Sequence, residues 1–454
     1  MEIANITLTC ALGITALLFW ALYGHWIVPP VLTAICLTAF TSTTLILWSS
    51  TALHAFTIAW LLTSCWVLAL GCHLGMSASG AGKTGAKGWA RGVHFEPGPD
   101  PGRHRRLALI RPRSFFLFCF ACGIAAHLLT MAGEQVELGR LTSIEGLVSL
   151  GREMAIKRYF EDYSPPLSAR LLGSLSLTGL LVAGATMALP SSRPLRPYAA
   201  LQFVALLFGA LIHTARSGFL MGCIMFFSSY VVTAGYVGFT KSFFRRLGVW
   251  SVGVILFLTV FAVSVQSQRG GVLDPESFSD ATAIVRDSIL GALASFDQWF
   301  VADDGSSLRW GFYTFGGVFT VLGLGERIAG VYEHTVDVGT TTTNIYTAMR
   351  GLIEDFSLPG ALIVLFLFGC LWGYSFVKVR QGSLHHWIIA SMGYGTVLYG
   401  FIVSLLTYNT VILAWLLAYG YLMLPRMIRF LPRPVLPSPT GSGDVSPARR
   451  TGEG

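Results

Sequence analysis

Long apolar runs, separated by shorter polar stretches, occupy most of this chain. About eleven of them approach the roughly 20 residues that an α-helix needs to cross a bilayer. The expected runs cover residues 6–24, 27–48, 52–73, 114–132, 167–189, 198–214, 217–236, 248–266, 358–377, 386–406 and 409–425. The pattern predicts an all-α, polytopic integral membrane protein.

Two of the connections are long enough to hold structure of their own, residues 133–166 and residues 267–357. Within them, residues 141–160 and 281–300 place apolar side chains at helical spacing with charged residues between. This spacing is typical of amphipathic helices that lie on a membrane surface. On the second helix, Arg286 and Asp297 are eleven residues apart, which is close to three turns, so both are expected to project from one face.

The composition agrees with a membrane protein. Of the 454 residues, 53% are hydrophobic and 12% are charged, whereas soluble domains carry about 25% charged residues. The net charge of +8 does not indicate nucleic-acid binding, because most basic residues lie in short connections between apolar runs. No glycine-rich phosphate loop and no Cys/His cluster with metal-ligand spacing occurs in the sequence, so neither a cofactor nor a bound metal is expected.

The basic connections predict the orientation of the chain. Lys and Arg cluster in residues 74–113, 190–197, 237–247 and 378–380 and after residue 425, which all fall on one side of the membrane. By the positive-inside rule that side is the cytoplasm, so the N-terminus and the two long connections lie outside. The expected divisions are N-terminal membrane helices (1–73), a basic, partly disordered cytoplasmic loop (74–113), central membrane helices (114–266), an external loop (267–357), C-terminal membrane helices (358–430) and a disordered cytoplasmic tail (431–454).

Four arginines are expected near the outer membrane boundary: Arg216, Arg269, Arg286 and Arg350. Arginine binds phosphate through a planar fork, and an arginine in membrane-embedded sequence usually faces a polar cavity or a partner. These residues predict an anionic site at the level of the outer headgroups. The alternatives are a snorkelling Arg216 and scattered headgroup contacts. His213, three residues before Arg216, either reaches the same cavity or packs as an ordinary helix histidine.

Polar groups are densest in residues 340–355. Residues 340–344 are expected to form a capping turn for a helix whose one face carries Asn344, Thr347, Gly351 and Asp355. Arg350 lies on the adjacent face with Tyr346 and Glu354, and it can simply pair with Glu354 at i, i+4. Asp355, at the start of a membrane span, is the candidate general base. Asp287 and His334 are weaker candidates for that role.

The order of these motifs resembles the Wzy-type oligosaccharide repeat-unit polymerases of bacterial surface polysaccharides, over roughly residues 200–430. The residues that carry the resemblance are His213-Thr214-Ala215-Arg216-Ser217-Gly218, Arg269, Val285-Arg286-Asp287, Thr343-Asn344-Ile345-Tyr346-Thr347, Glu354-Asp355-Phe356 and Gly360. One departure is Ser357, because a glycine is more usual directly after the Asp-Phe pair.

The resemblance implies a membrane glycosyltransferase of GT-C-like architecture in the bacterial inner membrane. Such enzymes transfer a growing glycan from undecaprenyl pyrophosphate to a new lipid-linked repeat unit, and a chain-length regulator is a candidate partner. In this chain Arg216, Arg269 and Arg286 would hold pyrophosphate, while Arg350 and Asp355 would handle the acceptor. The further substrate contacts would be His213, Asn344, Tyr346, Asp287 and His334.

Two other functions fit parts of the same pattern. A surface-polysaccharide ligase uses the same donor and differs in its acceptor. A flippase for lipid-linked oligosaccharides is a transporter, and transporters tend to have inverted repeats and charges near the bilayer midplane. The sequence shows no such repeat and few charges within its apolar runs.

Overall fold

The computed structural model describes residues 2–23, 27–47, 53–79, 112–160, 165–214, 216–237, 253, 257, 259–267, 275–302, 308–325, 332, 335–338 and 341–430. The α-helices are α1 (Glu2–Tyr23), α2 (Pro29–Leu47), α3 (Ala55–Ala78), α6 (Pro112–Gly133), α7 (Ile144–Phe160), α8 (Leu167–Met187), α9 (Arg196–His213), α10 (Arg216–Val237), α12 (Pro275–Ala302), α13 (Gly316–Val321), α14 (Ala348–Arg380), α15 (Trp387–Tyr399) and α16 (Asn409–Phe430). The shorter elements are the 3-10 turns η2 (Leu138–Thr142), η3 (Pro190–Leu195), η4 (Leu384–His386) and η5 (Leu405–Thr407) and the strands β1 (Val336–Val338) and β2 (Thr341–Thr343).

Seven helices in the described part of the chain are long and apolar enough to cross a membrane. They cover Ile6–Tyr23, Ala55–Ala78, Pro112–Gly133, Leu167–Met187, Ser192–His213, Ser217–Val237 and Ala348–Arg380. Each coincides with an apolar run expected from the sequence, which supports an all-α membrane protein with several spans. The total of eleven spans stays a prediction, because most of the run 248–266 lies outside the described residues.

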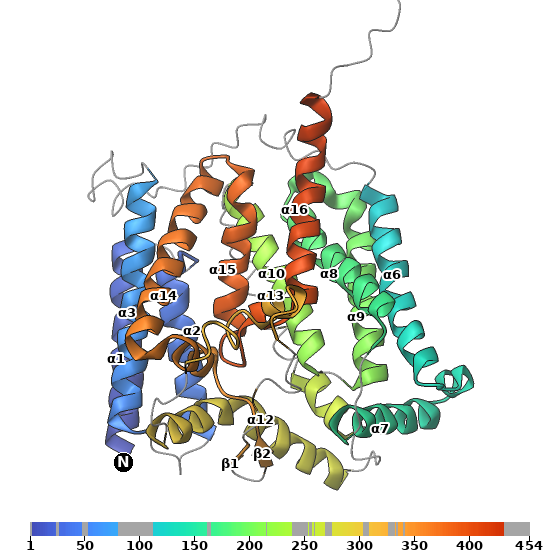
Figure 1. Cartoon of the computed structure of the whole chain (residues 1–454), viewed down its shortest axis with the longest axis horizontal. Coiled ribbons are helices and arrows are strands. Elements are labelled where there is room, and N and C mark those ends of the chain that lie inside the picture. Colours follow the sequence, from blue (N-terminus) through green and yellow to red (C-terminus); the bar gives the residue numbers. More distant parts are fainter. Residues whose placement is uncertain are drawn as a thin grey trace, which may run out of the picture.

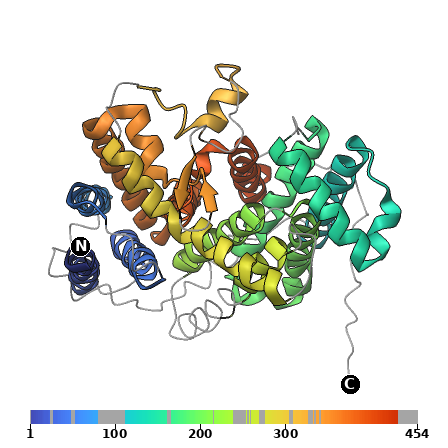
Figure 2. The same ribbon diagram turned by 90° about the horizontal axis from the view of Figure 1, so that it is seen from below.

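The long helices run side by side, and α7 and α12 lie across one end of this bundle (Figure 1). Seen from below that end, α12 extends diagonally beneath the bundle (Figure 2). The surface helices expected at residues 141–160 and 281–300 are therefore present, as the 17-residue α7 and the 28-residue α12. At the opposite end Lys378 follows the span of α14, and its Nζ donates to the carbonyl oxygen of Ser79, 3.0 Å away.

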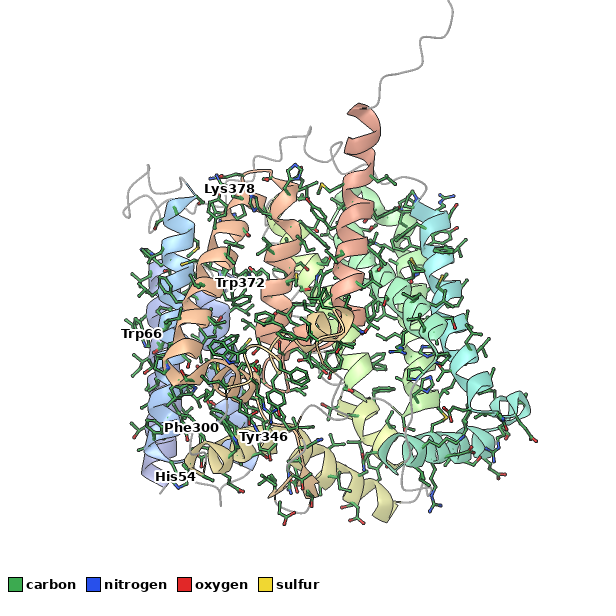
Figure 3. All side chains as sticks on the ribbon, in the orientation of Figure 1. His54, Trp66, Phe300, Tyr346, Trp372 and Lys378 are labelled. Atoms are coloured by element: carbon green, nitrogen blue, oxygen red, sulfur yellow. The ribbon has the colours of Figure 1, made fainter. Side chains whose placement is uncertain are left out.

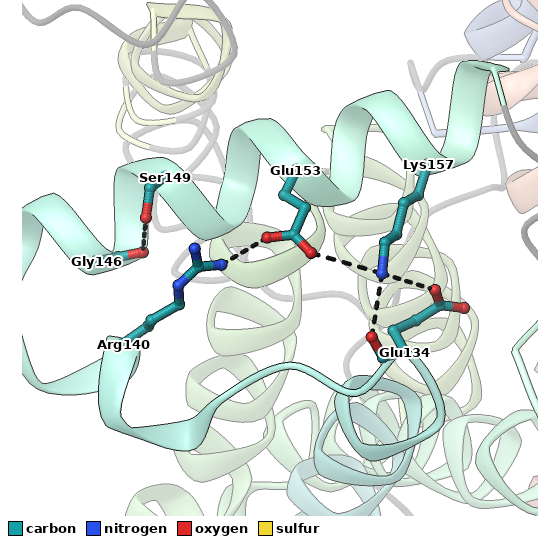
Figure 4. Close-up of polar contacts among 6 residues, drawn as sticks. All are labelled: Glu134, Arg140, Gly146, Ser149, Glu153 and Lys157. Atoms are coloured by element: carbon teal, nitrogen blue, oxygen red, sulfur yellow. Dashed lines mark hydrogen bonds and ion pairs between the residues drawn. The ribbon is translucent and has the colours of Figure 1, made fainter.

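Ion pairs with the residues that precede α7 (Figure 4) and an apolar cluster hold this helix in place. Arg140 pairs with Glu153 at 2.5 Å, and Lys157 pairs with Glu134 at 3.2 Å and with Glu153 at 3.5 Å. The apolar cluster consists of Met131, Val136, Leu150, Met154 and Ile212. Because these residues come from α7, from α9 and from the end of α6 and the turn after it, α7 fixes the end of the bundle at which α9 passes into α10.

Helices α3 and α14 approach each other closely through glycine residues. A Cβ atom added at Gly71 would lie 3.1 Å from the backbone nitrogen of Cys370, and one added at Gly373 would lie 2.8 Å from the Cα of Cys72. Gly75 and Gly369 make equally close backbone approaches, so each helix contributes two glycines four residues apart. Small residues allow such close packing of membrane helices. The contact anchors α14, whose first turns carry Arg350 and Asp355.

Near the predicted outer side, α14 and α15 depart from regular membrane helices. Helix α14 has 33 residues but is kinked at Ser357, two residues before Pro359. Helix α15 has 13 residues, or about 20 Å, which is shorter than the roughly 30 Å of a bilayer core. The expected continuous span at 386–406 is therefore wrong: the helix ends at Tyr399, and a turn and η5 lead into α16.

Candidate functional site

Asp355 organises the backbone around the first turns of α14. Its carboxylate is fully buried and accepts hydrogen bonds from the backbone N–H groups of Tyr313, at 3.1 Å, and Thr314, at 2.6 Å. The N–H groups of Arg309 and Trp310 donate to the carbonyl oxygens of Glu354 and Asp355. Buried polar groups must be hydrogen-bonded to be tolerated. Here the hydrogen bonds of Asp355 meet that requirement, and they join residues 309–314 to α14.

The other side of the same segment is bound to the turn between α15 and α16. The hydroxyl of Ser404 donates to the carbonyl oxygen of Thr314, and that of Thr407 donates to the carbonyl oxygen of Tyr313, both at 2.9 Å. We call Tyr313, Thr314, Ser404 and Thr407, together with Arg350, Glu354 and Asp355, the polar layer. Irregular backbone at membrane depth is tolerated where it is buried in protein or lines a polar cavity. The polar layer fills the space left where α15 stops short.

Arg350 lies in an aromatic cage within this layer. Its guanidinium carbon is 4.0 Å from the ring centre of Tyr346, 4.2 Å from that of Tyr332 and 5.0 Å from that of Trp299. Its Nε donates to Glu354 Oε1 at 2.7 Å, and its side chain is 3% exposed. Burial raises the pKa of Tyr332 well above its ordinary value, and the nearby Glu354 raises it further, so this ring is a neutral phenol. The cage connects α12, Tyr332 and the start of α14.

The arrangement bears on the predicted acceptor site. Arg350 and Asp355 do lie in one layer, and Tyr346 contacts Arg350. The i, i+4 pairing of Arg350 with Glu354, one of the two alternatives from the sequence, is present. Both proposed acceptor residues are buried, at 3% and 0% exposure. Binding of a substrate to either side chain would therefore require residues that pack on them, among them Tyr313, Thr314 and Tyr332, to move.

The expected capping turn at residues 340–344 is wrong. Residues 341–343 instead form β2, which pairs antiparallel with β1 so that Val336 lies opposite Thr343. Helix α14 begins at Ala348, after Thr347. Asn344 precedes the helix and therefore does not share a helical face with Asp355; its side-chain amide lies 3.5 Å from the carbonyl oxygen of Tyr332.

A second charged site lies on α12, toward its N-terminal half. Arg286 Nε donates to Asp287 Oδ1 at 2.7 Å; the carboxylate side chain is fully buried, whereas the arginine side chain is 38% exposed. This hydrogen bond raises the pKa of Arg286. A guanidinium has five N–H donors; the Nε–H of Arg286 donates to the buried carboxylate, and the arginine side chain as a whole stays partly exposed.

Arg216 lies at the start of α10, directly after the turn between α9 and α10, as the two adjoining apolar runs indicated. Helix α9 ends at His213, Thr214 adopts a left-handed conformation with φ of 46°, and α10 begins at Arg216. His213 Nε2 lies 3.1 Å from His127 Nδ1, so the packed-histidine alternative describes it. The side chain of Arg216 and the whole of Arg269 and His334 lie outside the described residues.

One short helical segment connects this turn with the Arg286 site. Within residues 259–267, Phe261 and Val265 pack against Ala210 and Phe219, which flank the α9–α10 turn. On the same segment, Ala262 and Val263 pack against Ala281 and Val285 of α12. The start of α10 at Arg216 and the turn of α12 that carries Arg286 therefore belong to one packed region, at the end of the bundle that α12 crosses.

Sequence reasoning missed the partners that come from distant segments. Trp299 and Tyr332 complete the Arg350 cage, and their position within a polar segment was the available signal. His54, just before α3, pairs with Asp297 at 2.8 Å. Asp297 and Arg286 do lie eleven residues apart on one helix, as expected, but no local pattern connects residues 54 and 297.

Comparison with known proteins gives no match: no protein-family model, curated protein or solved structure matches this chain.

Proposed function

We propose that this protein is a membrane glycosyltransferase that joins undecaprenyl-pyrophosphate-linked oligosaccharide repeat units into a surface polysaccharide. The reaction would take place at the periplasmic face of the bacterial inner membrane. The observation that carries the proposal is the Arg286–Asp287 pair, in which a buried carboxylate fixes a partly exposed arginine on a helix lying across the bundle end. A fixed arginine at that level suits the pyrophosphate of a lipid-linked donor.

The reaction needs positive charge at its leaving group. When a hydroxyl of the acceptor sugar attacks the anomeric carbon of the donor, the bond to pyrophosphate breaks and negative charge develops on that group. Hydrogen-bond donors that are already oriented stabilise this charge without having to reorganise during the step. Arg286 is oriented by Asp287, and we assign Arg216 and Arg269 to the same pyrophosphate.

The acceptor would bind toward the polar layer. There Arg350 and Asp355 would hold the new repeat unit after the layer opens, with Tyr346 and Asn344 beside them. Holding two lipid-anchored substrates in one membrane region supplies much of the rate by positioning alone. In this arrangement the end of the bundle near Lys378 faces the cytoplasm, as the basic connections predict.

The backbone at Ser357 adds independent support. Ser357 has φ of 64° and ψ of 173°, a combination that is essentially restricted to glycine. The Wzy-type polymerases that the sequence resembles more usually have glycine directly after the Asp-Phe pair, which is the position of Ser357 here. The conformation of this chain therefore fits the resemblance at the one motif position where the residue departs from it.

The test is the length profile of surface polysaccharide in a deletion strain that is complemented with variants. We expect Arg286→Ala to leave only single repeat units and Arg286→Lys to be strongly impaired, because lysine lacks the planar fork. Arg170→Ala is the matched control, since Arg170 is exposed near the start of α8, at the same end of the bundle. Normal polymer length from Arg286→Ala, at wild-type amounts of protein in the membrane, would refute the assignment of Arg286 to the pyrophosphate. Normal polymer length in the deletion strain itself would refute the proposed function.

The same strains separate the polymerase from the ligase alternative. Loss of a polymerase leaves single repeat units attached to the final acceptor. Loss of a ligase leaves no glycan attached at all, and that result in the deletion strain would favour the ligase.

A further inference from the structure

His54 and Asp297 form a dyad at the bundle end where α12 lies. Asp297 Oδ1 accepts a hydrogen bond from the backbone N–H of His54 at 2.9 Å, and Oδ2 lies 2.8 Å from His54 Nδ1. The Asp297 side chain is 4% exposed, whereas the His54 side chain is 56% exposed. Figure 3 places His54 close to Phe300 and at the opposite end of the bundle from Lys378.

The carboxylate determines which nitrogen of His54 is available. An ionised carboxylate only accepts hydrogen bonds, so Nδ1 is the nitrogen that carries the proton, and the lone pair of a neutral imidazole lies on Nε2. A buried carboxylate behind an imidazole also stabilises the imidazolium that forms when Nε2 takes up a proton. The negative charge of Asp297 makes this a poor place for a phosphate and a good place for a proton acceptor.

The dyad is held rigidly from two helices. His54 is the residue directly before α3, so the backbone bond to Asp297 fixes the start of that helix. Next to it, the rings of Phe56 and Phe300 are stacked with centres 5.0 Å apart, and Trp60 lies 6.0 Å from Phe300. A catalytic group needs such support, because its orientation must be set before the substrate arrives.

The position along α12 suits a direct displacement. Asp297 follows Arg286 by eleven residues on one helix, which is about 16 Å along the axis and about 20° around it, so both lie on one flank. In a single displacement, the base acts on the face of the sugar opposite the leaving group. An attacking oxygen about 3 Å from the anomeric carbon and about 2.8 Å from its base puts that base on the order of 10 Å from the arginine holding the leaving group. Arg286 and Asp297 are thus separated along α12 and not adjacent, as a base and a leaving-group arginine on opposite sides of one anomeric carbon must be.

We infer that His54, positioned by Asp297, is the general base that removes the proton from the attacking hydroxyl of the acceptor sugar. This inference rests on the proposed function. The acceptor oxygen forms a bond to the anomeric carbon while its proton passes to His54 Nε2. The bond between that carbon and the pyrophosphate oxygen breaks, and undecaprenyl pyrophosphate leaves with the electron pair. The imidazolium then gives its proton to water.

The experiment measures kcat and KM of the full-length protein in lipid nanodiscs with a purified lipid-linked repeat unit as substrate. The key variant is His54→Asn, because an asparagine amide can donate to Asp297 as Nδ1 does but cannot accept the proton. We expect His54→Asn and His54→Ala each to lower kcat by roughly 100-fold or more, with KM changed less than about threefold. Free imidazole should restore part of the activity of His54→Ala. Asp297→Asn should lower kcat with a similarly small change in KM, since Asp297 acts through His54.

Each result decides one proposal. If His54→Asn keeps near wild-type kcat, His54 serves only as a structural tie, and the inference is overturned even where His54→Ala fails to fold. Arg286→Ala and the wild-type protein, measured in the same assay, distinguish a failure of the inference about His54 from a failure of the proposed function. An inactive Arg286→Ala with an active His54→Asn overturns the dyad alone, and full activity of Arg286→Ala overturns the role assigned to Arg286. A wild-type protein that does not join lipid-linked repeat units overturns the proposed function as well.

Discussion

Ser357→Gly should stabilise this protein, although glycine within a helix usually destabilises. Ser357 interrupts α14 with φ of 64° and ψ of 173°. In this region the Cβ atom of an L-residue collides with its own backbone, and a non-glycine residue held there costs about 1–3 kcal/mol. Glycine removes the collision. It also makes the unfolded chain more flexible, which costs roughly 0.5–1 kcal/mol.

The surrounding structure keeps the kink whichever residue occupies position 357. The carbonyl oxygens of Glu354 and Asp355 accept hydrogen bonds from Arg309 and Trp310. Pro359, two residues after Ser357, has no N–H to continue the helix ladder. Because the conformation is imposed from both sides, the substitution changes the strain and leaves the contacts. The net expectation is a gain of up to about 2 kcal/mol in the free energy of unfolding.

The measurement is thermal unfolding of the purified protein in detergent, followed by intrinsic fluorescence. Ser357→Ala should melt at the wild-type temperature or lower, because alanine keeps the Cβ atom. Ser168→Gly is the control, since Ser168 is exposed in the first turn of α8, and there glycine should cost up to about 0.5 kcal/mol. If Ser357→Gly lowers the melting temperature as Ser168→Gly does, the strain argument is wrong.

Two other predictions concern the bundle and its surface helix. A Cβ atom at Gly75 would lie 2.9 Å from the Cα of Cys370, so Gly75→Ala should push α3 and α14 apart by roughly 1 Å and cost about 1–3 kcal/mol in thermal unfolding. Gly420→Ala is the control, because a Cβ atom there meets nothing within 4 Å, and an equal loss in both variants would contradict the close packing. The hydrogen bond from Arg140 lowers the pKa of Glu153. The Glu153 contribution to stability is therefore present above the unfolded pKa of about 4.3 and lost as the pH falls through the lower folded value. Hydrogen exchange of α7 should accelerate in that acidic window in the wild type, and Glu153→Gln should remove this step; an identical response of both proteins would contradict it.

Features with a local cause were predictable from the sequence. Helices α7 and α12 follow from the spacing of apolar and charged residues within single segments, and the α9–α10 junction follows from two adjoining apolar runs. The break before the span at 358 follows from the change in polarity together with Pro359. In each case the residues that determine the element lie within a few turns of one another.

Features that depend on distant partners were not predictable. Hydropathy did not separate α15, which stops after 13 residues, from a complete span, because both are buried among apolar helices. The threonines of β2 suit a strand or a cap equally well, and β1 and α12 decide between the two. The partners of Asp355, Arg350 and Asp297 come from separate segments, and nothing in the local sequence around any of these three residues encodes them.

Helix α12 contributes to the sites of Arg286, His54 and Arg350, and this has an energetic consequence. Asp287 and Asp297 are both buried on it, with partners on the same helix and on α3, respectively, while Trp299 reaches Arg350. A buried carboxylate that loses its partner is strongly destabilising, so the contacts of Asp297 with His54 and of Trp299 with Arg350 fix both the rotation of α12 and its position along the bundle. The interactions that hold the helix thus also set the distance between the proposed phosphate-binding arginine and the proposed base. Substitutions at Arg286 and His54 should therefore be non-additive in activity although the residues do not touch, because each acts on one bond-making and bond-breaking step across the same helix.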